Sequence, residues 1–295
     1  MNKNKQRLQE INMQRALSSV IKQFFYIFLP LKLFQLILNT NNAVIQLSLF
    51  AIGSILLWLW LNKNYPVIFL NKSRPTVKNI IELIIYSWST RFITLLLYYL
   101  ISLIIPMSFD HHLEGISLWN AFFISVLFSP VVEEVFFRGI VLHRLVPFGI
   151  GIAFIFNALI FAWGHLDALY ILNAFALGIV FSYAAYTYGL QWSIILHALW
   201  NGYSVFVLNM NMNNGTVFTM GQYSISSVLI TEILIAIFNI VCFIYVIIKL
   251  IKNRVFIKNI LFLHMPRRSH LFEVIKNPWF IGYTVITLAF SFFNK

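Results

Sequence analysis

The chain has 295 residues, of which 60% are hydrophobic and only 10% are charged, and its mean hydropathy is +0.82. This composition excludes an ordinary soluble domain, and apolar runs of about 17 to 25 residues, long enough to cross a bilayer, recur along the chain. The formal net charge is +12, but the basic residues cluster at the ends of the apolar runs, where they set topology and meet anionic lipid headgroups, so nucleic acid is excluded as an expected partner.

The apolar runs predict an all-α fold, a polytopic bundle of about eight transmembrane helices. The expected spans are 17–39, 43–61, 79–106, 117–142, 148–165, 168–188, 190–209 and 225–248. The last apolar segment, from Pro278, is short for a span and predicts a ninth helix that either crosses the membrane or lies in its interface. We expect three regions: 1–116 with the first three helices, a core at 117–209, and 210–295 with the eighth helix and a basic tail.

The loops between these spans differ in charge. Basic residues precede the first span, follow the second and fourth spans, and are dense from Lys249 to Arg268, whereas the loops at 110–114 and 209–215 are acidic or uncharged. Cytoplasmic loops are enriched in Lys and Arg. The pattern predicts a multi-pass protein of a cell membrane whose N-terminus and basic tail are cytoplasmic.

Two adjacent acids and an arginine interrupt the fourth expected span, in the stretch SPVVEEVFFRGIVLHRL at 129–145. Ionisable groups in a bilayer are costly, so they usually face the protein interior and are paired or functional. Glu134 and Arg138 are four residues apart, with the acid first, which favours a local ion pair. Glu133 points about 100° away from Glu134 on the helix. We therefore expect Arg138 to neutralise Glu134 and Glu133 to remain available for chemistry.

Two further polar pairs occur on later expected spans. Phe161 and His165, in FAWGH, lie one turn apart, and so do His197 and Asn201, in HALWN. An imidazole and a carboxamide side by side can donate two hydrogen bonds to one oxygen. A free carboxylate, a first histidine and a donor pair form a coherent set for hydrolysis of a carbonyl, in which Glu133 takes a proton from water and His165 helps to hold that water.

These three motifs, E-E-x-x-x-R with a following Gly139, F-x-x-x-H and H-x-x-x-N, resemble those of the CAAX-protease and bacteriocin-processing family of intramembrane peptidases. The resemblance covers about 117–209. It implies a glutamate-dependent endopeptidase that acts on a membrane-embedded or membrane-anchored peptide or protein. Glu133 and His165 would activate water, and His197 and Asn201 would form the oxyanion hole. Bacterial members of the family are implicated in peptide maturation, pheromone processing and immunity to bacteriocins.

The expected span boundaries conflict with this arrangement in one respect. At about 1.5 Å per residue from the cytoplasmic ends, Glu133 and His197 lie about 10 to 15 Å deep, whereas His165 lies about 26 Å deep. Helix tilt, or a break near Gly149 and Gly151, would reconcile the depths. We give the motifs more weight than the boundaries. The site is expected to open towards the cytoplasm or the inner leaflet.

Each polar group also has a purely structural interpretation. Glu133, Glu134 and Arg138 could form an ion network between helices, and the histidines and Asn201 could serve as helix-end or interhelical hydrogen-bond partners. Arg91, near the middle of the third span, is expected to pair with an acid on another helix. The sequence does not assign a role to Glu232. His111 and His112 beside Asp110 are expected to lie in a solvated loop rather than to bind a metal.

Three other functions compete with the metal-independent peptidase. Glu133, His165 and His197 match the two-histidine, one-carboxylate ligand set of catalytic zinc, although no H-E-x-x-H is present and Cys242 is the only cysteine. A transporter or proton relay would also use acids and histidines within the membrane, but no inverted repeat supports it. A catalytically silent scaffold or immunity protein is the third. We expect no cofactor, with zinc as the minority alternative.

Overall fold

The structure is a computed structural model of the chain. It describes residues 73–103, 118–165, 168–212, 217–220 and 223–254, together with scattered positions between 8 and 59 and between 276 and 285. The first two expected spans, the segment from Pro278 and the loop with Asp110, His111 and His112 lie wholly or largely outside the described residues.

Helix α3, Val77–Ser102, has a start that its sequence defines. The backbone of Thr76 is extended, and its hydroxyl accepts a hydrogen bond from the N–H of Asn79, while the Asn79 side chain accepts one from the N–H of Thr76 at 3.0 Å. This reciprocal capping satisfies two of the N–H groups that a helix start leaves unpaired. The helix therefore begins two residues before the predicted start at 79.

A long helical run from Leu118 to Phe148 carries the two adjacent acids. It consists of α4 (Leu118–Ala121), the π-helix η1 (Phe122–Phe128), α5 (Ser129–Glu134), the π-helix η2 (Val135–Leu142), α6 (His143–Leu145) and the 3₁₀ turn η3 (Val146–Phe148). The predicted end at 142 was wrong by six residues. His143 and Arg144 lie in the last turns of the helix, where cations interact favourably with the carbonyl end, and do not begin a loop.

The remaining helices follow closely. Gly149, with φ 129°, makes a turn that favours glycine, and α7 (Ile150–Trp163) runs back from it. A second positive-φ glycine, Gly189 at φ 110°, separates α8 (Ala168–Tyr188) from α9 (Leu190–Met212). A hairpin of β1 (Val217–Met220) and β2 (Tyr223–Ser226) then leads into α10 (Ser227–Lys252). The hairpin was not predicted, whereas the bounds of α8 are those expected.

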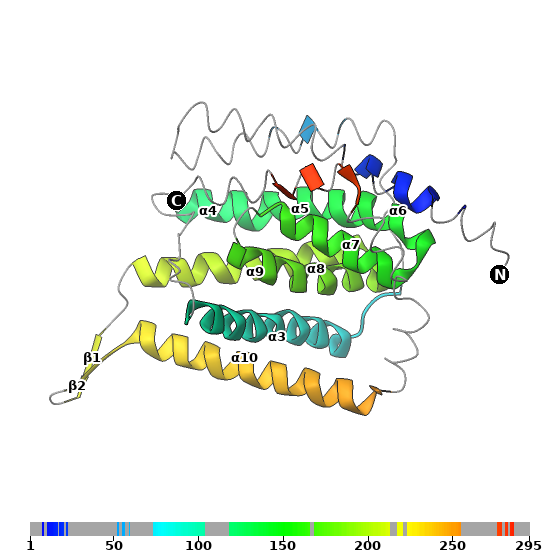
Figure 1. Cartoon of the computed structure of the whole chain (residues 1–295). Coiled ribbons are helices and arrows are strands. Elements are labelled where there is room, and N and C mark those ends of the chain that lie inside the picture. Colours follow the sequence, from blue (N-terminus) through cyan, green and yellow to red (C-terminus); the bar gives the residue numbers. More distant parts are fainter. Residues whose placement is uncertain are drawn as a thin grey trace.

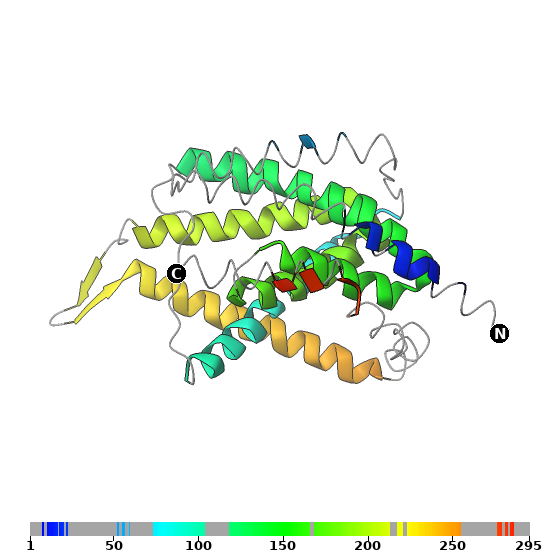
Figure 2. The same cartoon turned by 45° about the horizontal axis from the view of Figure 1, so that its top comes forward.

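The helices stack in layers, as Figure 1 shows. The long run with α5 and α7 lies on one side, α8 and α9 lie in the middle, and α3 separates them from α10. The turned view in Figure 2 also shows α9 running beside the long run that contains α4 and α5. The main buried cluster joins η2, α7 and α8, with Val141, Leu142 and Ala153 fully enclosed. The middle layer thus places α9 against both acids of α5.

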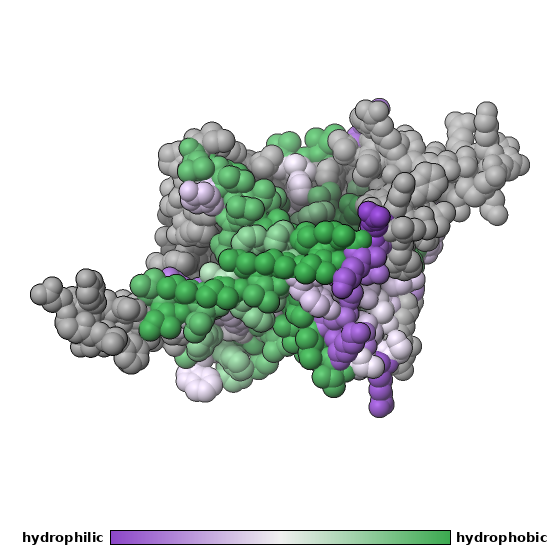
Figure 3. Space-filling model, turned by 90° about the horizontal axis from the view of Figure 1, so that it is seen from below, coloured by the Kyte–Doolittle hydropathy of each residue, from purple (hydrophilic) through white to green (hydrophobic). Residues whose placement is uncertain are grey.

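An ion pair joins α3 to α10 near one end of the bundle. Lys249 Nζ lies 2.6 Å from Glu82 Oε2 and donates to Tyr86 Oη at 2.6 Å. Because an early residue of α3 meets a late residue of α10, the basic groups that flank these two helices gather at the same end. Figure 3 shows this as a hydrophilic band beside the apolar surface of the two helices. The exposed side chains of α10 in that surface include Ile233, Leu234, Ile237, Val241 and Ile244.

Four helices among the described residues are long and apolar enough to cross a membrane. They are Val77–Ile101, Leu118–Phe148, Ile171–Tyr188 and Leu229–Lys252, and Ile150–Trp163 is a shorter apolar helix. The chain is therefore a membrane protein whose described part is helical apart from one hairpin. A total of eight or nine helices stays a prediction.

A glycine allows α7 and α8 to pack closely. A Cβ added to Gly178 would lie 2.9 Å from both Cα and Cβ of Ala158, so a helix would have to move. We expect Gly178→Ala to lower the free energy of unfolding by about 1–3 kcal/mol. Gly202→Ala is the matched control, because its Cβ would meet Val126 at an ordinary 3.6 Å and should stabilise the helix by up to about 1 kcal/mol. Thermal unfolding in detergent measures both, and equal melting temperatures would contradict the packing argument.

Candidate functional site

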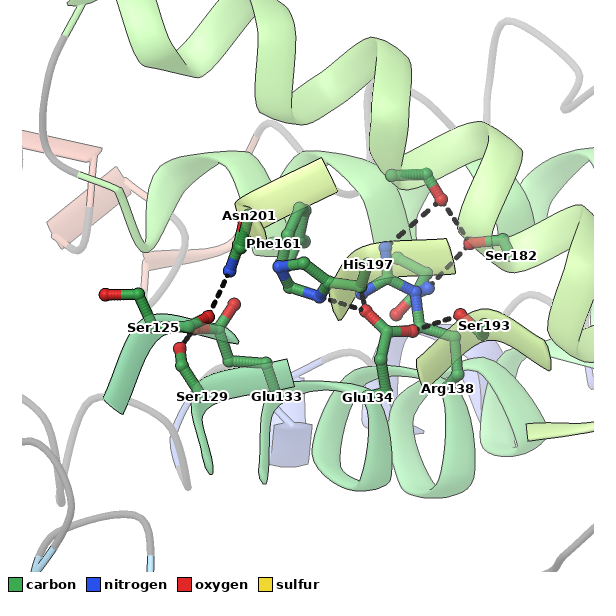
Figure 4. A network of polar contacts seen from close by, with 12 residues as sticks. Ser125, Ser129, Glu133, Glu134, Arg138, Phe161, Ser182, Ser193, His197 and Asn201 are labelled. Carbon is green, nitrogen blue, oxygen red and sulfur yellow. Dashed lines mark hydrogen bonds and ion pairs between the residues drawn. The ribbon is translucent and has the colours of Figure 1, made fainter. Parts of the chain in front are cut away.

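Glu134 is the centre of a buried polar network (Figure 4). Its Oε1 accepts a hydrogen bond from Arg138 Nη1 at 2.8 Å and lies 2.9 Å from His197 Nδ1. Its Oε2 accepts a hydrogen bond from the hydroxyl of Ser193. Ser193 and His197 are four residues apart on α9, so a single face of that helix contacts the carboxylate of Glu134. The predicted ion pair of Glu134 with Arg138 is confirmed, and the acid also holds α9 against α5.

Aromatic rings surround the guanidinium of Arg138. Its Cζ lies 4.3 Å from the centroid of the Phe161 ring and 5.4 Å from that of Phe181. A cation over the face of an aromatic ring is attracted by the ring's quadrupole, and the attraction is stronger where water is excluded. Phe161, one of the predicted supporting residues, therefore contacts Arg138 directly.

A second set of hydrogen bonds ties Arg138 to the interface of α7 and α8. Arg138 Nη2 donates to the carbonyl of Gly178 at 3.3 Å. The same carbonyl accepts a bond from the hydroxyl of Ser182 at 2.7 Å, and Asn157 Nδ2 donates to that hydroxyl at 2.8 Å. Asn157 and Ser182 are fully buried. Arg138 thus connects the long helical run to two further helices.

Loss of Arg138 should destabilise the protein. Arg138→Ala would leave Glu134 buried with one charged donor fewer, and breaking a buried pair in this way typically costs about 3–5 kcal/mol. We expect much less folded protein in detergent, measured by size-exclusion chromatography and thermal unfolding. Arg254→Ala, at an exposed position after α10, is the control and should change the free energy of unfolding by less than about 0.5 kcal/mol. Equal yields of the two variants would mean that the network is dispensable for folding.

Glu133 has a different environment from its neighbour. Its Oε1 accepts a hydrogen bond from the hydroxyl of Ser129, one turn earlier. Its Oε2 is buried and has no hydrogen-bond partner among the described residues. A buried carboxylate oxygen normally has a partner, so this atom is set apart from the rest of the network. The two adjacent acids are divided as the sequence predicted: one is fully paired and the other keeps one oxygen open.

His197 is held by rings as well as by Glu134. Its ring stacks on Phe181, with centroids 4.9 Å apart, and lies edge-on to Phe161 at 5.8 Å. With the carboxylate as acceptor, Nδ1 carries a proton, so Nε2 is a donor only when the ring is an imidazolium. The side chain is 3% exposed, and its orientation is fixed on three sides.

Asn201 lies one turn further along α9, where its Nδ2 donates to the carbonyl of Ser125 at 2.7 Å. A carboxamide has two N–H groups, and this bond uses one of them. Figure 4 shows Asn201 and Glu133 on the same side of the network, next to Ser125 and Ser129. The second N–H is therefore the one that could meet a ligand.

His165 follows the end of α7. Its Nδ1 lies 3.0 Å from the carbonyl of Phe161, and the two rings are 4.8 Å apart. His165 is exposed, whereas Glu134 and His197 are buried. His165 thus lies at the exposed edge of the network.

The conflict between the expected depths disappears once the helix continues to Phe148. Glu133 lies fifteen residues before Phe148 and His165 lies fifteen residues after Ile150. Both are therefore about 22 Å from the turn at Gly149 at 1.5 Å per residue. Phe137 and Phe161 are equally far from Gly149 along the chain, one before it and one after it. Their rings are in edge-on contact, with centroids 5.1 Å apart.

Arg91 was expected to pair with an acid. Its guanidinium lies over the ring of Tyr203, 4.9 Å from the centroid, and its Nε is buried without a hydrogen-bond partner among the described residues. An aromatic face stabilises a cation in an apolar setting. The acid partner stays a prediction, because Asp110 and Glu114 lie outside the described residues. Glu232 lies exposed on α10.

The zinc alternative needs three ligands that face one point. In the described part of the chain, no group of three or more His, Cys, Asp or Glu side chains is arranged to hold a metal ion. His197 directs Nδ1 to Glu134 and keeps Nε2, and Glu133 accepts a bond from Ser129 on Oε1 and keeps Oε2. Independence of metal therefore stays a prediction, which metal analysis of the purified protein tests.

Four polar residues of the site were missed from the sequence: Ser129, Asn157, Ser182 and Ser193. Two of them had a visible signal. Ser193 precedes His197 by four residues, as His197 precedes Asn201, and Ser129 precedes Glu133 by the same interval. Polar stripes at this spacing mark one face of a helix. Asn157 and Ser182 had no such signal, because only the packing of α7 on α8 brings them together.

Comparison with known proteins supports the identification that the motifs suggested. Residues 115–203 match the family described as Type II CAAX prenyl endopeptidase, Rce1-like, and this segment contains all three motifs. Searches of curated proteins and of solved structures found no match. The matched segment is the one that builds the buried network around Glu134, so this part of the chain is similar to the Rce1-like family of CAAX prenyl endopeptidases.

Proposed function

We propose that the protein is an intramembrane endopeptidase that hydrolyses a peptide bond in a membrane-associated peptide or protein with a glutamate-activated water. The observation that carries this proposal is the buried Oε2 of Glu133, which has no hydrogen-bond partner among the described residues and lies on the same side of the network as Asn201 (Figure 4). A general base needs an oxygen that is free to accept a proton, and Glu133 keeps one.

The proposed reaction starts with a water molecule between Glu133 and His165. Glu133 Oε2 takes a proton from the water as its oxygen attacks the carbonyl carbon of the scissile bond, and His165 helps to orient the water. The carbonyl oxygen becomes an oxyanion. When the tetrahedral intermediate collapses, the bond to nitrogen breaks and Glu133 returns the proton to the leaving amine.

His197 and Asn201 are the proposed donors to the oxyanion. Because Nδ1 of His197 faces Glu134, the donor role of Nε2 requires the imidazolium form. In that form the two positive groups, His197 and Arg138, balance the two carboxylates of Glu133 and Glu134. The cluster is then neutral overall in an environment that disfavours net charge. No metal ion or other cofactor takes part in the proposed reaction.

The setting of the site supports a proposal for the substrate class. The matched family is described as acting on CAAX prenyl substrates, and the surrounding helices are apolar towards the membrane. We propose a peptide anchored by an apolar or lipid-modified segment, reached from the cytoplasmic side, where the basic ends of the helices gather. Processing of a bacteriocin or pheromone is one role that such a peptidase could have.

Purified protein reconstituted in lipid vesicles tests the proposal. The probe is a farnesylated peptide ending in Cys-aliphatic-aliphatic-X with a fluorophore and a quencher on either side of the cysteine bond. A parallel comparison of membrane peptides, by mass spectrometry, in cells with and without the protein supplies a native substrate. We expect cleavage of the anchored peptide and much slower cleavage of the same peptide without an anchor. Unchanged peptide profiles together with no cleavage of the probe would contradict a peptidase.

A further inference from the structure

The helical turn from Ser125 to Pro130 contacts two of the proposed reacting groups at once. The carbonyl of Ser125 accepts a hydrogen bond from Asn201, and the hydroxyl of Ser129 donates one to Glu133. Neither contact involves Glu134 or Arg138. This turn is therefore a second support of the site, separate from the network around Glu134.

Pro130 explains why the Ser125 carbonyl is open to another helix. In an α-helix this carbonyl would accept the N–H of Ser129, four residues on, but that N–H bonds to the carbonyl of Ile124 instead. In the five-residue spacing of the π-helix the next donor would be residue 130, and proline has no N–H. The Ser125 carbonyl thus lacks both its α-helical and its π-helical donor, and Asn201 supplies one at 2.7 Å.

Ser129 distinguishes the two oxygens of Glu133. A glutamate side chain has three rotatable bonds, so a free carboxylate would sample several orientations. The hydroxyl of Ser129 fixes Oε1, and Oε2 is left without a hydrogen-bond partner in the described part of the chain. The next residue along the chain is Pro130, so the same turn fixes the acid on α5 and the amide on α9.

We propose that Ser129 and Pro130 are positioning residues that hold the Glu133 carboxylate and the Asn201 amide in a fixed mutual geometry. The inference rests on the proposed peptidase function and adds to it two residues outside the three motifs. Misplacement of a reacting group by about 1 Å can cost up to about a hundredfold in rate. The loss should appear in kcat, because neither residue is proposed to contact the substrate.

Ser129 is tested with two variants in the vesicle assay. Ser129→Ala should lower kcat about tenfold or more with little change in KM, and Ser129→Thr, which keeps the hydroxyl, should restore most of the rate. Ser87→Ala is the matched control, because the hydroxyl of this buried serine donates to the carbonyl of Leu83 in its own helix. Equal kcat values for Ser129→Ala and wild type, or a loss that Ser129→Thr does not restore, would overturn the role of Ser129.

Pro130 is tested through its coupling to Asn201. Pro130→Ala returns an N–H that can compete for the Ser125 carbonyl, so kcat should fall about tenfold or more in the wild-type background. In an Asn201→Ala background the same change should have little further effect, since the bond that it weakens is already gone. Equal losses in both backgrounds, or no loss in either, would overturn the role of Pro130.

The positioning role of Ser129 and Pro130 and the glutamate mechanism are contradicted by different results. If Glu133→Gln is inactive while Ser129→Ala and Pro130→Ala cleave at the wild-type rate, the positioning inference is wrong and the peptidase mechanism stands. If Glu133→Gln cleaves at the wild-type rate, the glutamate mechanism is wrong, and the inference falls with it.

Discussion

Glu133→Gln should reduce peptide cleavage by about 10²–10⁴-fold while the protein remains folded and inserted in the membrane. Glutamine has nearly the same shape, and its amide oxygen can still accept the hydrogen bond from Ser129. What it cannot do is take a proton from water at the position of Oε2. The vesicle assay with the farnesylated probe gives the rate, and size-exclusion chromatography with thermal unfolding reports on the fold.

The neighbouring acid is the matched control for this result. Glu134→Gln makes the same chemical change one residue later, but there it removes the charge that Arg138 and His197 share. We expect this variant to lose folded protein as well as activity. If the two variants lost activity and folded protein to the same extent, the division of roles between the two acids would be wrong.

His197→Ala and Asn201→Ala should each lower kcat by about 10²–10³-fold with little change in KM, as expected for loss of a donor to the oxyanion. The structure adds a difference between them. His197→Ala also deprives Glu134 of a partner and leaves a gap beside Phe181, so its yield should be lower than that of Asn201→Ala. Kinetic constants and melting temperatures measured together separate the two effects.

Leu199→Ala is a suitable control on the same helix, because this side chain is 48% exposed on the apolar surface. It should leave kcat unchanged. An unchanged kcat with a raised KM in the His197 and Asn201 variants would assign these residues to substrate docking instead.

The pairing within one helix could be predicted from the sequence, because residues four apart share a face. This reasoning gave the ion pair of Glu134 with Arg138 and left Glu133 outside that pair. Contacts between helices were harder. The three motifs indicated which helices meet, but the hydroxyl of Ser193 on Glu134 depends on the rotation of α9 against α5, which no local pattern fixes.

The errors have physical causes as well. The helix end at 142 was placed too early because His143 and Arg144 resemble a loop, although cations also suit the last turn of a helix. The ring of Tyr203 over Arg91 was not predicted, because only an acid was considered as compensation for a charge in the membrane. The π-helical turn before Pro130 has no simple sequence signature, so the contact of Asn201 with the Ser125 carbonyl could not be predicted.

The turn at Gly149 joins two antiparallel helical arms, the run Leu118–Phe148 and α7. The depth of each side chain in the membrane therefore depends on how many residues separate it from Gly149 along its own arm. A residue inserted between Arg138 and Gly149 would raise Glu133 relative to His165 by about 1.5 Å and turn it by about 100°. A compensating residue inserted between Gly149 and Phe161 would restore the level, although the helical rotation would change on both arms.

The length of the loop between β1 and β2 does not set the depth of any motif residue, since no motif residue follows it. Length changes should therefore be tolerated at the hairpin and rejected within the arms, and a library of single-residue insertions scored for activity would map that boundary along the chain.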